Sequence, residues 1–180
     1  FGITKSFVET PTKNKNLTQP SDIFAKSLYY NPSEEQQISR LESLLQPDAF
    51  ANITQRLADS GMRKGFACLF YGAPGTGKTE TVLQLARKTG RALMQVNISS
   101  IKDKYVGESE KNIKNLFDRY RLLVESEPIA PILFFNEADA IFNKRSENTV
   151  RAVDKMENAI QNIILQEMET LDGILIATTN

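Results

Sequence analysis

The sequence predicts an α/β fold, in which a parallel β-sheet is covered by helices on both faces. Short apolar runs alternate along the chain with amphipathic helical stretches, which is the order of elements that builds parallel sheets. The apolar runs are continuous rather than alternating with polar residues, as expected for strands whose two faces are both buried. In such a sheet, ligands bind beyond the carboxyl ends of the strands.

The first elements are predicted from local signals. Residues 1–32 are rich in Thr, Asn, Lys, Ser and Pro, so we predict a linker or loosely packed arm. A core domain is predicted over residues 33–180, and two helices open it. The first starts around Pro32-Ser33-Glu34-Glu35 and ends at Pro47, and the second runs from Asp48 to about Asp59.

Four strands and three more helices are predicted after these two helices. The strands are apolar runs bounded by turn residues, namely Phe66–Tyr71, Ala92–Asn97, Ile132–Phe135 and Ile174–Ala177. The helices carry apolar residues at helical spacing and cover Lys78–Lys88, Ser109–Glu125 and about Val150–Leu171. A loop is predicted at Ser99–Gly107.

Composition excludes several classes of function. The 180 residues carry 22 basic and 22 acidic side chains, and this balance argues against a nucleic-acid or membrane-surface protein. A single cysteine, Cys68, and the absence of histidine exclude an intrachain disulfide, His-based metal sites and the common catalytic triads. A cytoplasmic location fits best. Because the chain begins at Phe1 rather than Met, we expect residues before it.

The segment GAPGTGKT, Gly72 to Thr79, matches the phosphate-loop (Walker A) pattern between a predicted strand and a predicted helix. Its glycines let backbone N–H groups approach phosphate oxygens at a helix N-terminus. Lys78 supplies a point charge for the β- and γ-phosphates, and the Thr79 hydroxyl can ligate Mg²⁺. The predicted nucleotide-binding residues are Gly72, Ala73, Pro74, Gly75, Thr76, Gly77, Lys78, Thr79, Glu80 and Asn136; Glu80 is assigned only as a favourable acid of the first helical turn.

The strand Ile132–Phe135 ends in Asn136 and Glu137, where the usual Walker B pattern has Asp-Glu. Glu137 fits the residue that polarises the attacking water. Asn136 can accept a hydrogen bond from a metal-bound water but lacks the charge, a difference of about 3 kcal/mol at ~5 Å and an effective dielectric near 20. We therefore expect nucleotide binding with uncertain turnover, whether Asn136 is native or engineered. Asp139 is expected to cap the next helix.

Four segments, GAPGTGKT, SSIKDKYVGESEKNIKNLF, ILFFNEADAIFNKR and IATTN, occur in this order and spacing. Together they resemble the AAA+ ATPases, most closely the protein-remodelling group of katanin and spastin. The resemblance covers about Phe66 to Asn180. It implies a P-loop NTPase core that binds ATP and Mg²⁺, assembles into a ring, expected to be a hexamer, and acts on polypeptides. The balanced charge, as stated above, argues against a membrane or nucleic-acid partner.

The resemblance also implies residue roles. Tyr105, Val106 and Gly107 match the loop that lines the central pore and grips a polypeptide; packing of Tyr105 beneath the next helix is the alternative. Asn180 matches the sensor that contacts the γ-phosphate or attacking water, beside Lys78 and Glu137 as catalytic residues. The remaining matches are open: Lys144 and Arg145 face a neighbouring subunit or solvent, and Tyr29 and Tyr30 lie where such proteins contact adenine.

Two functions fit these residues best. The first is an ATP-hydrolysing motor that threads or remodels polypeptides, and the second is a nucleotide-dependent switch or assembly platform with weak turnover because of Asn136. A nucleotide kinase shares the phosphate loop but lacks the KYVGESE segment, and a DNA-acting AAA+ protein fits the neutral charge poorly. The arginine finger, a fifth strand and the C-terminal lid are expected beyond Asn180, so this segment alone should hydrolyse ATP slowly.

Overall fold

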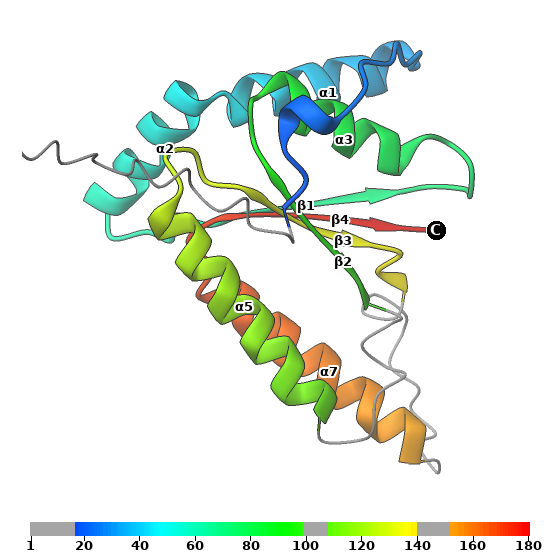
Figure 1. Cartoon of the computed structure of the whole chain (residues 1–180), viewed down its shortest axis with the longest axis vertical. Helices are drawn as coiled ribbons and strands as arrows, with labels where there is room; N and C mark the ends of the chain where they lie inside the picture. Colours follow the sequence, from blue (N-terminus) through cyan, green and yellow to red (C-terminus); the bar gives the residue numbers. More distant parts are fainter. Residues whose placement is uncertain (1–16, 99–107, 140–151) are drawn as a thin grey trace, which may run out of the picture.

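A computed structural model of the chain describes residues 17–98, 108–139 and 152–180. It contains one sheet with helices on both sides (Figure 1), which confirms the predicted fold class. The strands are β1 (Phe66–Tyr71), β2 (Leu93–Asn97), β3 (Ile132–Asn136) and β4 (Ile174–Thr179). The helices are η1 (Pro20–Asp22, a 3-10 turn), α1 (Pro32–Leu45), α2 (Pro47–Asp59), α3 (Lys78–Lys88), α5 (Glu108–Ser126) and α7 (Ala152–Glu169).

The register of the sheet aligns the ends of its strands. All four strands are parallel, in the order β1-β4-β3-β2. Tyr71 of β1 pairs with Thr179 of β4, and Asn97 of β2 pairs with Asn136 of β3. The carboxyl ends of β1, β4 and β3 therefore meet at one edge, and the segments that come after these strands are brought together there.

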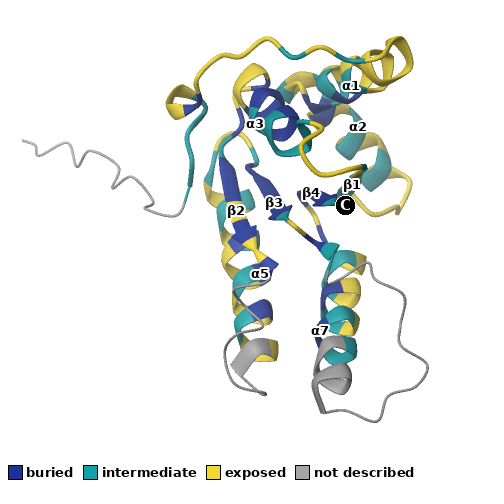
Figure 2. Ribbon diagram, turned by 90° about the vertical axis from the view of Figure 1, so that its right-hand side faces the viewer, coloured by how far each residue is buried: buried dark blue, intermediate teal, exposed yellow. Residues whose placement is uncertain are grey.

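Two apolar clusters occupy the two faces of the sheet. Alternate residues of β3 supply one cluster each: Ile132 and Phe134 pack with α1, α2 and α3, whereas Leu133 and Phe135 pack with α5 and α7. Figure 1 shows the two helical layers on opposite sides of the strands, and Figure 2 shows the central strands as the most buried part of the molecule. Burial of both faces explains the continuous apolar runs in the sequence.

Strand β1 lies at one edge of the sheet and is less covered. Its residues alternate between half-buried and exposed, with Phe66, Cys68 and Phe70 against the cluster of α1 to α3. Burial raises the pKa of the Cys68 thiol. Leu69 and Tyr71, on the opposite face, are exposed.

The later half of the predicted arm packs against the domain. Thr18 and Leu93 exchange two backbone hydrogen bonds of 2.9 Å as an isolated antiparallel bridge, and Ile23 is buried in the cluster of α1 to α3. The Gln84 amide of α3 then donates to the carbonyl oxygen of Phe24 at 2.8 Å and accepts from the Lys26 N–H at 3.2 Å. Residues 17–26 are thus fixed along β2 and α3, while the domain boundary after residue 32 stays a prediction.

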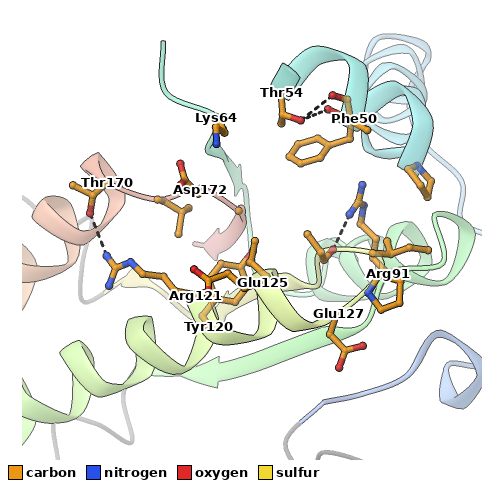
Figure 3. Close-up of a pocket in the computed structure, with 18 residues that line it drawn as sticks. Phe50, Thr54, Lys64, Arg91, Tyr120, Arg121, Glu125, Glu127, Thr170 and Asp172 are labelled. Atoms are coloured by element: carbon orange, nitrogen blue, oxygen red, sulfur yellow. Dashed lines mark hydrogen bonds between the residues drawn. The ribbon is translucent and has the colours of Figure 1, made fainter. Parts of the chain in front are cut away.

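A buried arginine joins elements at the amino ends of the strands (Figure 3). Arg91 is 2% exposed; its Nε donates to the Leu45 carbonyl at the end of α1, at 2.8 Å, and Nη1 donates to the Ala130 carbonyl at 2.7 Å. Its guanidinium carbon lies 4.9 Å from the centre of the Phe50 ring, within cation–π range. Burial lowers its pKa.

Tyr120 anchors α5 to the same end of the sheet. Its hydroxyl accepts from the Ile174 N–H at 2.7 Å and lies 2.8 and 2.9 Å from the carbonyl oxygens of Pro131 and Ile174. Burial raises the pKa of the Tyr120 hydroxyl well above its usual range, so it stays neutral. A Cβ on Gly173 would lie 2.3 Å from the hydroxyl oxygen, so only glycine fits there.

We predict that Tyr120→Phe lowers the free energy of unfolding by about 1–3 kcal/mol, because the Ile174 N–H loses its buried acceptor and the Pro131 and Ile174 carbonyls lose the one hydroxyl proton that lies between them. Urea denaturation monitored by circular dichroism measures this change. Tyr71→Phe, which removes the same hydroxyl from a side chain that is 82% exposed, is the matched control and should leave stability unchanged. Equal stability of the two variants would contradict the anchoring role.

Candidate functional site

The phosphate loop joins β1 to α3 through glycines in left-handed conformations. Gly75 has φ +77° and Gly77 has φ +88°, and a Cβ at either position would meet no atom within 4 Å. The backbone conformation, rather than lack of space, therefore requires glycine at these positions. The loop is closed by the Thr76 hydroxyl, which donates to the Ala73 carbonyl at 2.9 Å. Gly77 directly precedes α3, whose first N–H groups are left for an anion.

The Lys78 ammonium lies inside this loop. Nζ donates to the carbonyl oxygens of Gly72 and Ala73, at 2.6 and 2.8 Å, and to Oδ1 of Asn180 at 2.9 Å. The last of these contacts joins residues that are 102 positions apart in the sequence. The contact exists because β1 and β4 are neighbours whose carboxyl ends coincide.

Asn136 lies at the end of β3, and its side chain bonds to residues of both α3 and β4. Its Oδ1 accepts from the Thr79 hydroxyl of α3 and from the Thr178 hydroxyl of β4, each at 3.0 Å. These two donors occupy the oxygen of the amide. The remaining polar group of the side chain, its NH₂, can only donate hydrogen bonds.

Glu137 turns the chain after β3. It has φ +54°, the only positive φ of a non-glycine residue in the described part of the chain. This left-handed conformation is uncommon outside Gly, Asn and Asp. Its N–H donates to the Thr178 hydroxyl at 3.3 Å, and the N–H of Ala138 donates to the Thr178 carbonyl at 2.7 Å. The Glu137 side chain is exposed at the pocket.

Asp139 is bonded to the end of β4. Its Oδ1 accepts from the Thr179 hydroxyl and from the Asn180 N–H, both at 2.7 Å. These bonds, the hydroxyl first and then the backbone N–H, lower the pKa of the Asp139 carboxyl, so it is ionised at neutral pH. The residues that a helix cap at Asp139 would serve lie outside the described ranges.

One pocket of about 410 Å³ collects these groups. It is lined by Pro74, Gly75, Thr76, Gly77, Lys78, Thr79, Glu80, Asn136, Glu137, Thr178, Thr179 and Asn180. Ten of these twelve residues are site residues that the sequence predicts. Gly72 and Ala73, which the sequence also predicts, are absent from this lining, but their carbonyl oxygens accept hydrogen bonds from Lys78, which is part of it. The predicted residues therefore come together in space, although their chemical roles stay predictions.

A larger pocket of about 540 Å³ lies at the opposite end of the sheet (Figure 3). Its lining includes Lys64, Arg91, Ala130 and Gly173, each of which lies just before a strand. None of the predicted nucleotide-binding residues lines it. Among the described residues, those predicted to bind nucleotide therefore lie at the carboxyl edge.

The neighbourhood of the phosphate loop includes the arm. Glu80 forms a salt bridge of 2.7 Å with Lys26 and accepts from Gln84 at 2.9 Å; both contacts, Lys26 first, lower the pKa of the Glu80 carboxyl. The Tyr30 hydroxyl is 3.0 Å from the Thr81 hydroxyl, and Tyr29 is 95% exposed. Tyr30 therefore lies beside α3, and adenine contact by either tyrosine stays a prediction.

Some sequence predictions concern residues that the structure does not describe. The predicted pore loop, Tyr105 to Gly107, lies outside the described ranges, as do Lys144 and Arg145. Conversely, sequence reasoning missed three contributors to the site: Thr178, Thr179 and the contacts of Asp139. Two hydroxyl residues directly before the predicted sensor Asn180 were the available signal, but their partners depend on the register of β3 and β4.

The sequence profile of the ATPase family associated with various cellular activities (AAA) matches residues 68–180, which is more than half of the chain. The chain therefore belongs to this family. It is 33% identical over 130 residues to 26S proteasome regulatory subunit 7 of Dictyostelium discoideum, covering 72% of this chain and 27% of that protein.

Other relatives show the same partial coverage. The chain is 33% identical over 140 residues to peroxisomal ATPase PEX1 of Saccharomyces cerevisiae, which covers 76% of this chain and 12% of PEX1. It is 28% identical over 133 residues to proteasome-activating nucleotidase 2 of Haloferax volcanii, which covers 70% of this chain and 30% of that protein. The chain spans less than a third of each of these relatives. Among the described helices, none is long and apolar enough to cross a membrane.

We predict that Lys78→Ala weakens ATP binding at least tenfold, since the ammonium is the cation that lines the pocket beside the phosphate-loop N–H groups. Titration with a fluorescent ATP analogue measures the dissociation constant. Lys64→Ala removes the same charge at the amino end of β1 and is the control, with affinity unchanged. Equal affinities in both variants would contradict this placement of the phosphates.

Proposed function

We propose that this chain is the nucleotide-binding core of an ATP-hydrolysing motor that assembles into a ring and remodels or threads polypeptides. The observation that carries the proposal is the convergence of Lys78, Asn180, Asn136 and Glu137 in one pocket at the carboxyl edge of the sheet. Family membership supports it, as do relatives that are named as ATPases and as regulators of the proteasome.

Each residue has a distinct task in this proposal. Lys78 exchanges its carbonyl partners for β- and γ-phosphate oxygens, since its three present acceptors are all neutral oxygens and a phosphate binds an ammonium more strongly. Asn180, freed from that contact, hydrogen-bonds the γ-phosphate or the attacking water. Glu137 accepts a proton from this water as a general base.

The hydroxyl of Thr79 and the amide oxygen of Asn136, 3.0 Å apart, are hard oxygen donors of the kind that Mg²⁺ prefers. Thr79 would hold the ion directly and Asn136 would do so through a water molecule. Mg²⁺ bound there would neutralise part of the negative charge of the phosphates. The described residues contain no cluster of three or more acidic, His or Cys side chains, so phosphate oxygens and water would complete the ligands.

The proposal that the substrate is a polypeptide is based on the sequence. The segment Tyr105 to Gly107 resembles the pore loop of the protein-remodelling group, with an aromatic and a β-branched side chain before a glycine. Within the family, the placement beside katanin and spastin stays a prediction, since the relatives described above are proteasomal and peroxisomal proteins. A hexameric ring and a cytoplasmic location belong to the same proposal.

A nucleotide-dependent switch with weak turnover is the second candidate, and the contacts of Asn136 favour it. An aspartate there would offer two acceptor oxygens and a negative charge. Asn136 offers one oxygen, already shared by two hydroxyl donors, and an NH₂ group that cannot accept from a metal-bound water. The missing charge amounts to about 3 kcal/mol at ~5 Å with an effective dielectric near 20, which is enough to slow turnover without preventing binding.

Steady-state ATP hydrolysis of the full-length protein separates the two candidates. For a motor, we predict turnover by the native protein and at least a hundredfold loss in Glu137→Gln, because the amide cannot take the proton. Asn136→Asp should then change the rate by less than tenfold. If only Asn136→Asp hydrolyses ATP while the native protein binds it, the switch is correct and the motor is wrong.

We further predict that Tyr105→Ala abolishes ATP-driven translocation of a fluorescently labelled unfolded casein, while ATP affinity stays within twofold of native. The aromatic ring is the part of the loop that would grip the chain, so Tyr105→Phe should retain most of the activity. Undiminished translocation by Tyr105→Ala would refute threading through this loop.

A further inference from the structure

The ladder between β3 and β4 stops before the site begins. Its last pair is Phe135 with Ala177, and two residues later Glu137 adopts its left-handed conformation. The chain therefore leaves the regular ladder with β4 at the position where the proposed reaction needs Glu137 and Asn180 in a fixed relation. Regular backbone pairing with β3 does not supply that relation beyond Ala177.

Individual hydrogen bonds replace the ladder on both sides of the turn. Thr178 bonds to three consecutive residues at the end of β3 and in the turn. Its hydroxyl donates to Asn136 and accepts from the Glu137 N–H, and its carbonyl oxygen accepts from the Ala138 N–H. Asp139 contacts the next two residues of the β4 segment, because one of its carboxylate oxygens accepts from both Thr179 and Asn180 at 2.7 Å. At 2.7 Å these two bonds are as short as the backbone bond between Ala138 and Thr178, and the carboxylate charge assists them.

Asp139 thereby connects the turn that carries Glu137 to the residue that reaches Lys78. The Asn180 backbone is held by Asp139 at 2.7 Å while its side-chain oxygen accepts from Lys78 at 2.9 Å. Asp139 itself is absent from the lining of the nucleotide pocket. Its hydrogen bonds reach the site through Asn180, Thr179 and the turn at Glu137, and its carboxylate also interacts electrostatically with the Lys78 ammonium.

We propose that Asp139 is a positioning residue for ATP hydrolysis, which fixes Asn180 and Glu137 relative to each other without contacting the nucleotide. The inference rests on the proposed roles of Glu137 and Asn180. What the position needs is an acceptor oxygen directed at the Thr179 hydroxyl and the Asn180 N–H. An amide oxygen can accept both of these bonds, whereas an apolar side chain of similar size accepts neither.

The experiment compares Asp139→Asn and Asp139→Leu in the full-length protein. We expect Asp139→Leu to lower kcat at least tenfold, with ATP affinity within threefold of native, and Asp139→Asn to keep kcat within threefold. Asp172→Leu, at the opposite end of β4, is the control and should behave as native. Thr179→Val, which is nearly isosteric and removes one of the two donors, should lower kcat at least threefold and serves if Asp139→Leu does not fold.

Three results would overturn the inference. The first is a kcat equal to that of the native protein in both Asp139→Leu and Thr179→Val. The second is a loss of ATP affinity as large as the loss of kcat, since Asp139 would then contribute to nucleotide binding. The third is an equal loss in Asp139→Asn and Asp139→Leu, which would show that charge matters and the acceptor does not.

Hydrogen exchange separates this inference from the proposed function. If the native protein does not hydrolyse ATP, or Glu137→Gln hydrolyses it normally, the proposed function fails whatever Asp139 does. Exchange at the Asn180 amide, measured by mass spectrometry, needs no turnover. It should be at least tenfold faster in Asp139→Leu than in the native protein while β1 amides are unchanged, and unchanged exchange at Asn180 would refute the contact itself.

Discussion

The parallel register that ends β1, β4 and β3 at one edge of the sheet is the constraint that places every other part of the molecule. Each of these strands carries a different part of the chemistry into the segment after it. The phosphate loop comes after β1, Asn180 after β4, and Glu137 after β3. A slip of one residue in any strand would reverse which of its side chains face each helical layer, so the two apolar clusters fix the register and thereby place the site.

The two ends of the sheet use polar groups differently. At the amino ends, Arg91 and Tyr120 are fully buried, and their hydrogen bonds join them to backbone groups of neighbouring elements. At the carboxyl ends, polar side chains bond both to one another and to the backbone, and most of them line one pocket. The first arrangement fixes the helices to the sheet, and the second leaves groups that can exchange partners with a ligand.

The contacts of Asn136 bear directly on the choice between the motor and the switch. Its oxygen joins the phosphate-loop helix to β4 through two threonine hydroxyls, a task that an aspartate could also perform. An amide does so without placing a charge beside the phosphates. The same residue can therefore preserve the geometry of an ATPase of this family while reducing its electrostatic assistance, and for this reason both candidate functions centre on it.

Local patterns of residues were enough to predict the fold class, the boundaries of β1 and α3, and the phosphate loop, because continuous apolar runs, helical spacing and glycine-rich turns are local signals. They also predicted Glu137 as a site residue, and the resemblance to the AAA+ ATPases implied Asn180. The folded chain was needed to show that Lys78 bonds Asn180, that Asp139 holds the end of β4, and that residues 17–26 pack along β2 and α3. These contacts join segments far apart in the chain, and their partners are set by strand order and register, which no local pattern of residues specifies.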